Sequence, residues 1–183
     1  IDLALKYADA LDCQKIHCMA GIPLPGTAPE AAHETLLDSF SLAAEKFAPE
    51  GISLMIEPLN TIEMPHYAVS SPDYAVALIE AIGRSRSGLQ YDFYHMTLMG
   101  EDHSSRLPTL MPLIDHIQIA DAPGRHEPGS GSIPFDQILP AIESLGYSGW
   151  IGCEYVPAST TREGLHWRSN YMTSVPNHTL PAS

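Results

Sequence analysis

Four polar side chains with oxygen ligands stand at the ends of four apolar segments of the chain. They are Glu57, Asp92, Gln118 and Glu154. Side chains alternate between the two faces of a strand, so in each segment this residue lies opposite the main apolar positions. If the apolar face packs against helices, the four polar groups point into one interior, each at or near the carboxyl end of its strand. Such an arrangement is suited to binding a cation and to moving protons.

Three carboxylates that share one interior are costly, because each raises the pKa of the others and each loses hydration. Pairing with separate lysines or arginines would lower this cost. The chain has only nine such residues, however, and none falls on the inner face of the strands that carry the carboxylates. A divalent metal ion is the simpler solution. Carboxylates together with one amide carbonyl favour a hard ion, Mg²⁺ or Mn²⁺, over Zn²⁺.

The segment 115–127 combines the third of these apolar strands with a polar loop that turns at Pro123-Gly124. The planar guanidinium of Arg125 in this loop is suited to binding both oxygens of a carboxylate, and a surface ion pair is the alternative. His126 and Glu127 are expected to hydrogen-bond each other and so to fix the loop. A polar loop after a strand is where an α/β barrel places its active site.

Three more polar residues lie near the other strand ends. His95 follows Asp92 by three residues, which fits either contact with a substrate or a hydrogen bond to a backbone carbonyl. We expect the side chain of Asn60 to close the turn after Glu57. His17 is expected only to fill the floor or the mouth of the fold.

Short apolar runs alternate with helical patterns along the chain. The expected strands are 15–20, 52–57, 88–92, 115–120 and 149–155. The expected helices are 1–11, 30–48, 72–82, 102–113, 135–145 and one from about residue 161 past residue 167. Residues 93–96 are expected to form a loop. Ser71, Pro72 and Gly83 give the third helix its start and stop signals.

Strands that alternate with helices in this way predict parallel βα units and an α/β fold. A closed (β/α)8 TIM barrel takes about 250 residues, so five strands predict an N-terminally truncated piece with five of the eight units. The sequence also opens on Ile1 inside a helical pattern. The expected domain is 1–168, the C-terminal part of one barrel, followed by a poorly ordered tail at 169–183. An open doubly wound sheet is the alternative.

Composition narrows the class of protein. Nine basic and 22 acidic residues give a net charge of −13, which disfavours nucleic acid as a partner because its binding depends on neutralising phosphates. No apolar run approaches the length of a membrane span, and no signal peptide is visible. Three cysteines without metal-ligand spacing favour reduced thiols and a cytoplasmic location.

Several motifs resemble a known family. The segments IEPLN (56–60), QYDFYHM (90–96), HIQIADAPGRHEPGSG (116–131) and GCEYVP (152–157) are similar to hydroxypyruvate isomerase and 2-oxo-tetronate isomerase. That family belongs to the xylose isomerase-like TIM-barrel superfamily. The resemblance runs in order from residue 1 to about residue 168 and does not cover the tail.

The resemblance implies roles for the residues that match. The implied metal ligands are Glu57, Asp92, Gln118 and Glu154. Glu57 and Glu154 also match the paired catalytic glutamates of the family, while His95 and Arg125 match residues that contact the substrate. The implied reaction interconverts hydroxypyruvate and tartronate semialdehyde, or a related short 2-oxo hydroxy acid, by metal-assisted proton transfer. A 1,2-hydride shift is the alternative that the resemblance leaves open. The implied partner is therefore a small hydroxy-keto acid. Assembly into a homo-oligomer is a second interaction that the sequence leaves open.

Three rival functions are weighed against this one. A ketose 3-epimerase of the same superfamily would carry a histidine in place of Gln118. A metal-dependent endonuclease of related fold would need more inward histidines and a basic face, which the net charge of −13 disfavours. A non-catalytic remnant that keeps the ligands without closing a site is the third alternative.

Overall fold

The computed structural model describes residues 1–171. These residues form one parallel sheet with the strand order β1-β2-β3-β4-β5. The strands are β1 (Lys15–His17), β2 (Ser53–Ile56), β3 (Ser87–Asp92), β4 (Ile114–Ile119) and β5 (Ile151–Cys153). The α-helices are α1 (Asp2–Leu11), α2 (Pro29–Phe47), α3 (Pro72–Ile82), α4 (Phe93–Leu98), α5 (His103–Leu110), α6 (Phe135–Ser144) and α7 (Arg168–Tyr171). Short 3-10 turns are η1 (Ala48–Glu50), η2 (Met111–Leu113) and η3 (Glu163–Leu165).

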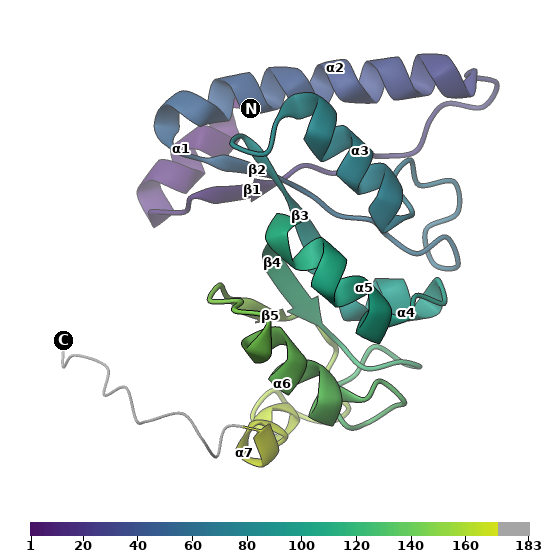
Figure 1. Cartoon of the computed structure of the whole chain (residues 1–183), viewed down its shortest axis with the longest axis vertical. Helices are drawn as coiled ribbons and strands as arrows, with labels where there is room; N and C mark the ends of the chain where they lie inside the picture. Colours follow the sequence, from purple (N-terminus) through teal and green to yellow (C-terminus); the bar gives the residue numbers. More distant parts are fainter. Residues whose placement is uncertain (172–183) are drawn as a thin grey trace.

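The strands follow one another in the sheet in the order in which they occur in the sequence. A doubly wound sheet reverses its strand order part-way, so that alternative is wrong. Sequential parallel strands joined by helices are the arrangement of a TIM barrel, and the chain forms about five of its βα units. Figure 1 shows α2, α3, α5 and α6 along one side of the curved sheet. Among residues 1–171, β1 and β5 each pair with a single strand and are the two edges.

The core lies between the sheet and these helices. Leu54 and Ile56 of β2, Leu89 of β3, and Ile117 and Ile119 of β4 are buried in one apolar cluster with residues of the helices. The expected assignment of strand faces is therefore confirmed. The register places the opposite face in order as well, because Asp92 pairs with Gln118 across β3 and β4. Alternation thus brings polar side chains together on the concave side of the sheet.

Local signals account for the helix starts. The Ser71 hydroxyl accepts a hydrogen bond from the backbone N–H of Tyr74 at the start of α3, and Gly83 follows the last turn, as expected. The expected loop at 93–96 is wrong, because these residues begin α4. The Asp92 carboxylate caps that helix by accepting from the backbone N–H groups of Tyr94 and His95. A strand end that is itself an N-cap leaves no room for a loop.

The remaining boundaries differ from the expected ones mainly at the two ends of the sheet. The first expected strand, 15–20, ends at His17, and the last, 149–155, is only Ile151–Cys153. The expected final helix reduces to η3 and the four residues of α7. Of the expected tail, residues 169–171 belong to α7, and 172–183 lie outside the described residues.

Helix α1 forms where its pattern predicts, yet most of its apolar residues face solvent. Leu3, Tyr7 and Leu11 are 66%, 62% and 73% exposed, and Ala8 is the buried residue of the helix. Within residues 1–171, no helix combines the length and the apolar character that crossing a membrane requires.

Candidate active site

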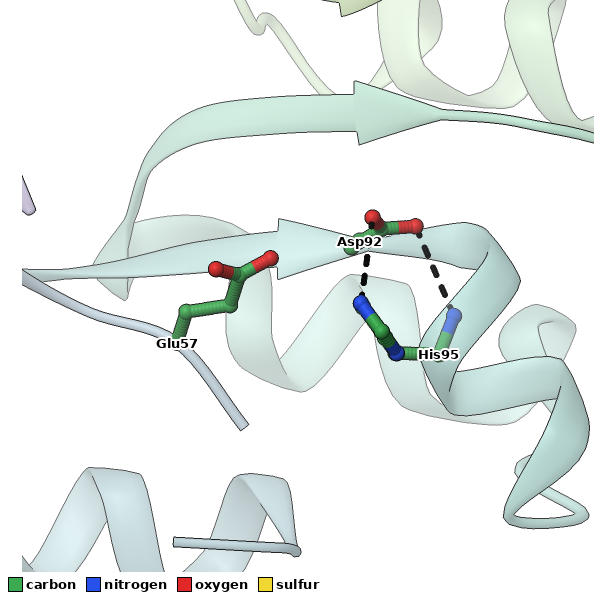
Figure 2. A group of neighbouring side chains, drawn as sticks. All are labelled: Glu57, Asp92 and His95. Carbon is green, nitrogen blue, oxygen red and sulfur yellow. Dashed lines mark hydrogen bonds and ion pairs between the residues drawn. The ribbon is translucent and has the colours of Figure 1, made fainter. Parts of the chain in front are cut away.

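The carboxyl ends of β2 and β3 bring three ionisable side chains together. Glu57 directly follows β2, Asp92 is the last residue of β3, and His95 lies in the first turn of α4. A ligand atom of each lies within 4.8 Å of the others, and all three residues are buried. Figure 2 shows the Glu57 carboxylate turned toward Asp92 and His95. The strand alternation places the two acids, and the capping of α4 by Asp92 places the histidine.

Several polar atoms of this cluster and of the neighbouring His17 have no hydrogen-bond partner among the described residues. They are Glu57 Oε1, Asp92 Oδ2 and His17 Nε2, each buried from solvent. Buried polar atoms are almost always paired, and three unpaired ones at one place indicate a site that a ligand completes. Carboxylate oxygens are ligands for hard divalent cations. The side chains present therefore fit a metal ion.

The pKa values of the two acids also favour a bound cation. Burial, followed by repulsion from Asp92 and Glu154, raises the pKa of Glu57 from 4.5 to about 8. Burial also raises the pKa of Asp92 from 3.8 to about 7, although hydrogen bonds from the α4 backbone and the nearby Arg125 oppose the shift. Both acids hold protons more tightly than in water, because charge at this position is poorly solvated. A cation would reverse that preference.

The loop cation expected to bind substrate lies against these acids. Nη2 of Arg125 is 3.1 Å from Glu154 Oε2 and 3.9 Å from Asp92 Oδ2. Its guanidinium also lies over the ring of Tyr94, 5.1 Å from the centroid. The strands thus carry no cation to the carboxylates, as expected, but the loop after β4 does. Arg125 forms an ion pair with Glu154 but not with Glu57, whose buried oxygen Oε1 has no partner among the described residues.

A buried aspartate shapes the loop that presents Arg125. The Asp121 carboxylate accepts backbone N–H bonds from Ala122, Gly129, Gly131 and Ile133, at 2.8–3.0 Å. A Cβ on Gly131 would collide with the carbonyl oxygen of Ala122. Sequence reasoning missed Asp121; its signal is a lone acid between an apolar strand and a glycine-rich loop.

His126 and Glu127 fix this loop, but not by bonding to each other as expected. The Nδ1 atom of His126 lies 2.7 Å from the carbonyl oxygen of Val156, and the Glu127 carboxylate accepts from the backbone N–H of Ala158. The two side chains therefore bind the loop to the segment after β5. Residues 156–158 are too far away in sequence for pattern reasoning to pair them with the loop.

Five of the six expected site residues line one cavity of about 420 Å³. Its lining includes Glu57, His95, Gln118, Arg125 and Glu154. Asp92 lies behind this surface and is fully buried. The Gln118 carbonyl oxygen accepts a hydrogen bond from the Gln90 amide at 2.7 Å, and the Glu154 side chain is 49% exposed. The structure thus brings all six residues to one place.

Two lining residues go beyond the sequence expectations. His17 lines the cavity and contacts Glu57, with Nδ1 3.4 Å from Oε2, a contact that the sequence did not predict. Glu63 accepts a hydrogen bond from the Tyr94 hydroxyl and lies 4.0 Å from Arg125. The contact of His17 could have been predicted, because Ile16 packs against the core and the next residue of the strand must face the opposite side. Nothing in the local sequence signals the second, because Glu63 lies in an irregular turn.

Comparison with known proteins places the chain in a family. A family model described as xylose isomerase-like TIM barrel matches residues 1–171. The chain belongs to this family. It is 39% identical to hydroxypyruvate isomerase from Escherichia coli (strain K12) over 92% of its own length. It is 40% identical to 2-oxo-tetronate isomerase from Pectobacterium atrosepticum over 94% of its length.

Solved structures agree at the level of the fold. The crystal structure of an AP endonuclease, family 2, from Brucella melitensis is 40% identical and has a TM-score of 0.88 over 93% of this chain. A D-psicose 3-epimerase from Clostridium cellulolyticum H10 is 21% identical with a TM-score of 0.72, a likeness of fold alone. The chain spans 65% and 66% of the lengths of the two isomerase relatives.

Proposed function

We propose that this chain carries the active site of an isomerase that interconverts hydroxypyruvate and tartronate semialdehyde, or a closely related short 2-oxo hydroxy acid. The observation that carries the proposal is the cavity in which two glutamates, a histidine and an arginine meet beside buried, unpaired carboxylate oxygens. The two relatives named as isomerases of such acids support it.

The proposed metal ligands are Glu57, Asp92, Gln118 and Glu154. The unpaired oxygens of Glu57 and Asp92 support two of them. The amide of Gln90 orients the Gln118 carbonyl oxygen, which keeps a second lone pair. A bound Mg²⁺ or Mn²⁺ supplies Lewis-acid stabilisation of the negative charge that develops on the substrate oxygens.

The two glutamates are the proposed proton carriers. One removes a proton from the hydroxymethyl carbon beside the ketone, and the other delivers a proton to the former carbonyl carbon. The hydroxyl proton moves to the other oxygen, so the atoms balance and the product is the aldehyde. Glu57 is suited to this because its carboxylate lines the cavity and its Oε1 has no hydrogen-bond partner among the described residues.

Arg125 and His95 are the proposed substrate contacts. Arg125 is partly exposed at the cavity, and its fork fits the carboxylate that every substrate of this class carries. His95 is 3% exposed, and burial lowers its pKa to about 4, so the ring is neutral at the pH of the cell. A neutral imidazole donates a hydrogen bond to an oxygen without adding charge.

The test is turnover of hydroxypyruvate by the 183-residue chain with Mg²⁺ or Mn²⁺ in D₂O, followed by NMR. We expect tartronate semialdehyde with deuterium on the carbon that receives the proton. Isomerisation without deuterium would overturn the proton-transfer mechanism in favour of a hydride shift. Metal binding without turnover would support the non-catalytic alternative, and inversion at C3 of a ketose would support the epimerase.

The proposed carboxylate anchor is tested with Arg125→Lys. An ammonium cannot reproduce the two parallel hydrogen bonds of a guanidinium, so KM for hydroxypyruvate should rise roughly 10-fold or more, while turnover of neutral ketoses should stay low and unaffected. Arg162→Lys, at an exposed position, is the matched control. An equal effect on acidic and neutral substrates would contradict the anchor.

A further inference from the structure

The two ring nitrogens of His95 have different surroundings. Nδ1 lies 2.6 Å from the side-chain nitrogen Nδ2 of Asn60 and 3.4 Å from the backbone nitrogen of the same residue. Nε2 lies on the side of the acids, 3.9 Å from Asp92 Oδ2, which is beyond hydrogen-bond length. Asn60 is fully buried. One residue therefore provides both contacts of Nδ1.

The orientation of the Asn60 amide follows from Glu63. The backbone N–H of Glu63 donates to Asn60 Oδ1 at 2.8 Å, which closes the turn expected from the sequence. The Glu63 carboxylate accepts from Asn60 Nδ2 at 3.2 Å, and the Tyr94 hydroxyl holds that carboxylate in turn. Rotating the amide by 180° would set oxygen against carboxylate and N–H against N–H. The nitrogen of the amide therefore faces the imidazole.

We propose that Asn60 is a positioning residue that holds His95 in the neutral tautomer with its proton on Nε2. Two N–H donors converge on Nδ1, and a donor cannot face another donor, so Nδ1 must present its lone pair. The ring then carries its single proton on Nε2. The contacts of Asn60 and Glu63 set this state before any substrate arrives.

The tautomer decides what His95 does in the site. An Nε2 that carries a proton has no lone pair for a metal ion, so His95 does not complete the cluster with Glu57 and Asp92, despite its proximity. The metal shell is then built from oxygen ligands. Resting on the proposed isomerase function, the Nε2 proton points at the substrate oxygen on which charge develops, where a fixed donor acts most strongly.

The test is the ¹⁵N NMR spectrum of the histidine rings, recorded without metal or substrate. The His95 signals are assigned by their loss in His95→Gln. We expect a protonated Nε2 and an unprotonated Nδ1 in the wild-type chain. A proton on Nδ1, or on both nitrogens, at neutral pH would overturn the proposal. Failure of the isomerase proposal leaves this measurement unaffected.

A double variant is designed to reverse the tautomer of His95. Asn60→Asp combined with Glu63→Gln places an acceptor against Nδ1 and supplies an amide donor to the new carboxylate. We expect the proton to move to Nδ1 in this double variant, which frees the lone pair of Nε2. Mn²⁺ bound at the site should then show ¹⁴N coupling in pulsed EPR that the wild-type chain lacks. Glu63→Gln alone is the matched control, because Asn60 keeps its orientation through the Glu63 backbone and the tautomer should stay as in the wild type.

Activity provides a second readout. The double variant should lower kcat roughly 100-fold, with KM changed by no more than a few-fold, because the lost donor acts where charge develops. Nitrogen coupling to Mn²⁺ in the wild-type chain would contradict the oxygen-only shell. If the double variant does not fold, the wild-type spectrum alone decides the question.

Discussion

The carboxyl of Glu57 lies where water does not reach Oε1 and where two other carboxylates repel its charge. Asp92 shares that environment, although α4 offers it two backbone N–H groups. The end of β2 or β3 fixes the position of each acid, while burial disfavours its charged form. This buried charge underlies both the proposed binding of a cation and the pH dependence of stability.

Stability without metal should fall as the pH rises toward 8. The folded chain holds a proton on Glu57 with a pKa of about 8, against 4.5 as the ordinary value. A raised folded-state pKa contributes stability that is complete below the unfolded value and is lost as the pH passes the folded value. Asp92, with a pKa of about 7, adds in the same direction.

Calorimetry in EDTA tests this. The wild-type chain should lose more Tm between about pH 6 and about pH 8.5 than Glu57→Gln does, because the variant lacks one of the two groups. Comparing the two chains cancels the buried histidines, whose lowered pKa values act in the opposite direction. Added Mn²⁺ should raise Tm more at the higher pH, since binding releases the protons. Parallel pH profiles for the two chains would contradict the assignment.

The two glutamates should be individually indispensable. Glu57→Gln and Glu154→Gln each remove a proton carrier and a proposed ligand, so turnover of hydroxypyruvate should fall roughly 10²–10⁴-fold. Metal content is measured alongside turnover to separate the two roles. Glu80→Gln, exposed on α3, is the control. Retention of more than about a tenth of the activity in either variant, with metal bound, would be incompatible with general acid–base catalysis by that residue.

At the scale of elements, alternation and capping account for most of what the sequence predicts. The parity of β2, β3 and β4 places Glu57, Asp92 and Gln118 on one face, because the apolar residues of each strand must meet the helices. The start of α4 was not predicted, because an aspartate that ends a strand gives the same local pattern whether or not it caps a helix.

The loops were beyond pattern reasoning. The pairing of Arg125 with Glu154 and the contacts of His126 with Val156 depend on two loops that meet only in the folded chain. The turn that the Asn60 side chain closes with Glu63 is local and was predicted. Its contact with His95 spans 35 residues and was not. Contacts of that span follow from the register of the strands and not from spacing along the chain.

The loop after β4 should depend on Asp121. Asp121→Asn replaces a carboxylate that accepts four N–H groups with an amide that has one acceptor oxygen, so buried donors lose their partners. The free energy of unfolding should fall by about 1–3 kcal/mol. KM for hydroxypyruvate should rise as well, because Arg125 is no longer held. Denaturant titration and kinetics measure the two effects, with the exposed Asp136→Asn as control. An unchanged KM would show that Arg125 does not depend on this loop geometry.

At the scale of the whole molecule, the described residues leave two kinds of unsatisfied surface. β1 and β5 each have a single neighbouring strand within residues 1–171, so backbone groups along both edges are open to pairing. Helix α1 exposes Leu3, Tyr7 and Leu11. Both features favour association of the 183-residue chain with itself.

Sedimentation velocity should therefore show concentration-dependent oligomers at micromolar concentrations. Leu3→Glu with Leu11→Glu should shift the distribution toward monomer, because a buried contact would then have to desolvate two carboxylates. Leu3→Glu with Ala10→Glu adds the same charge and removes one leucine, so it should have a smaller effect. A wild-type chain that stays monomeric and unfolds cooperatively would refute the prediction.

The four backbone bonds to Asp121 also have a genetic consequence. A loss-of-function screen on this chain would recover position 121 together with the residues of the cavity, and its alleles would look like substrate-binding mutants. Gly131 would appear beside it, because any side chain there meets the Ala122 carbonyl. Second-site suppressors of such alleles should cluster in 156–158, the segment that His126 and Glu127 already hold against the loop.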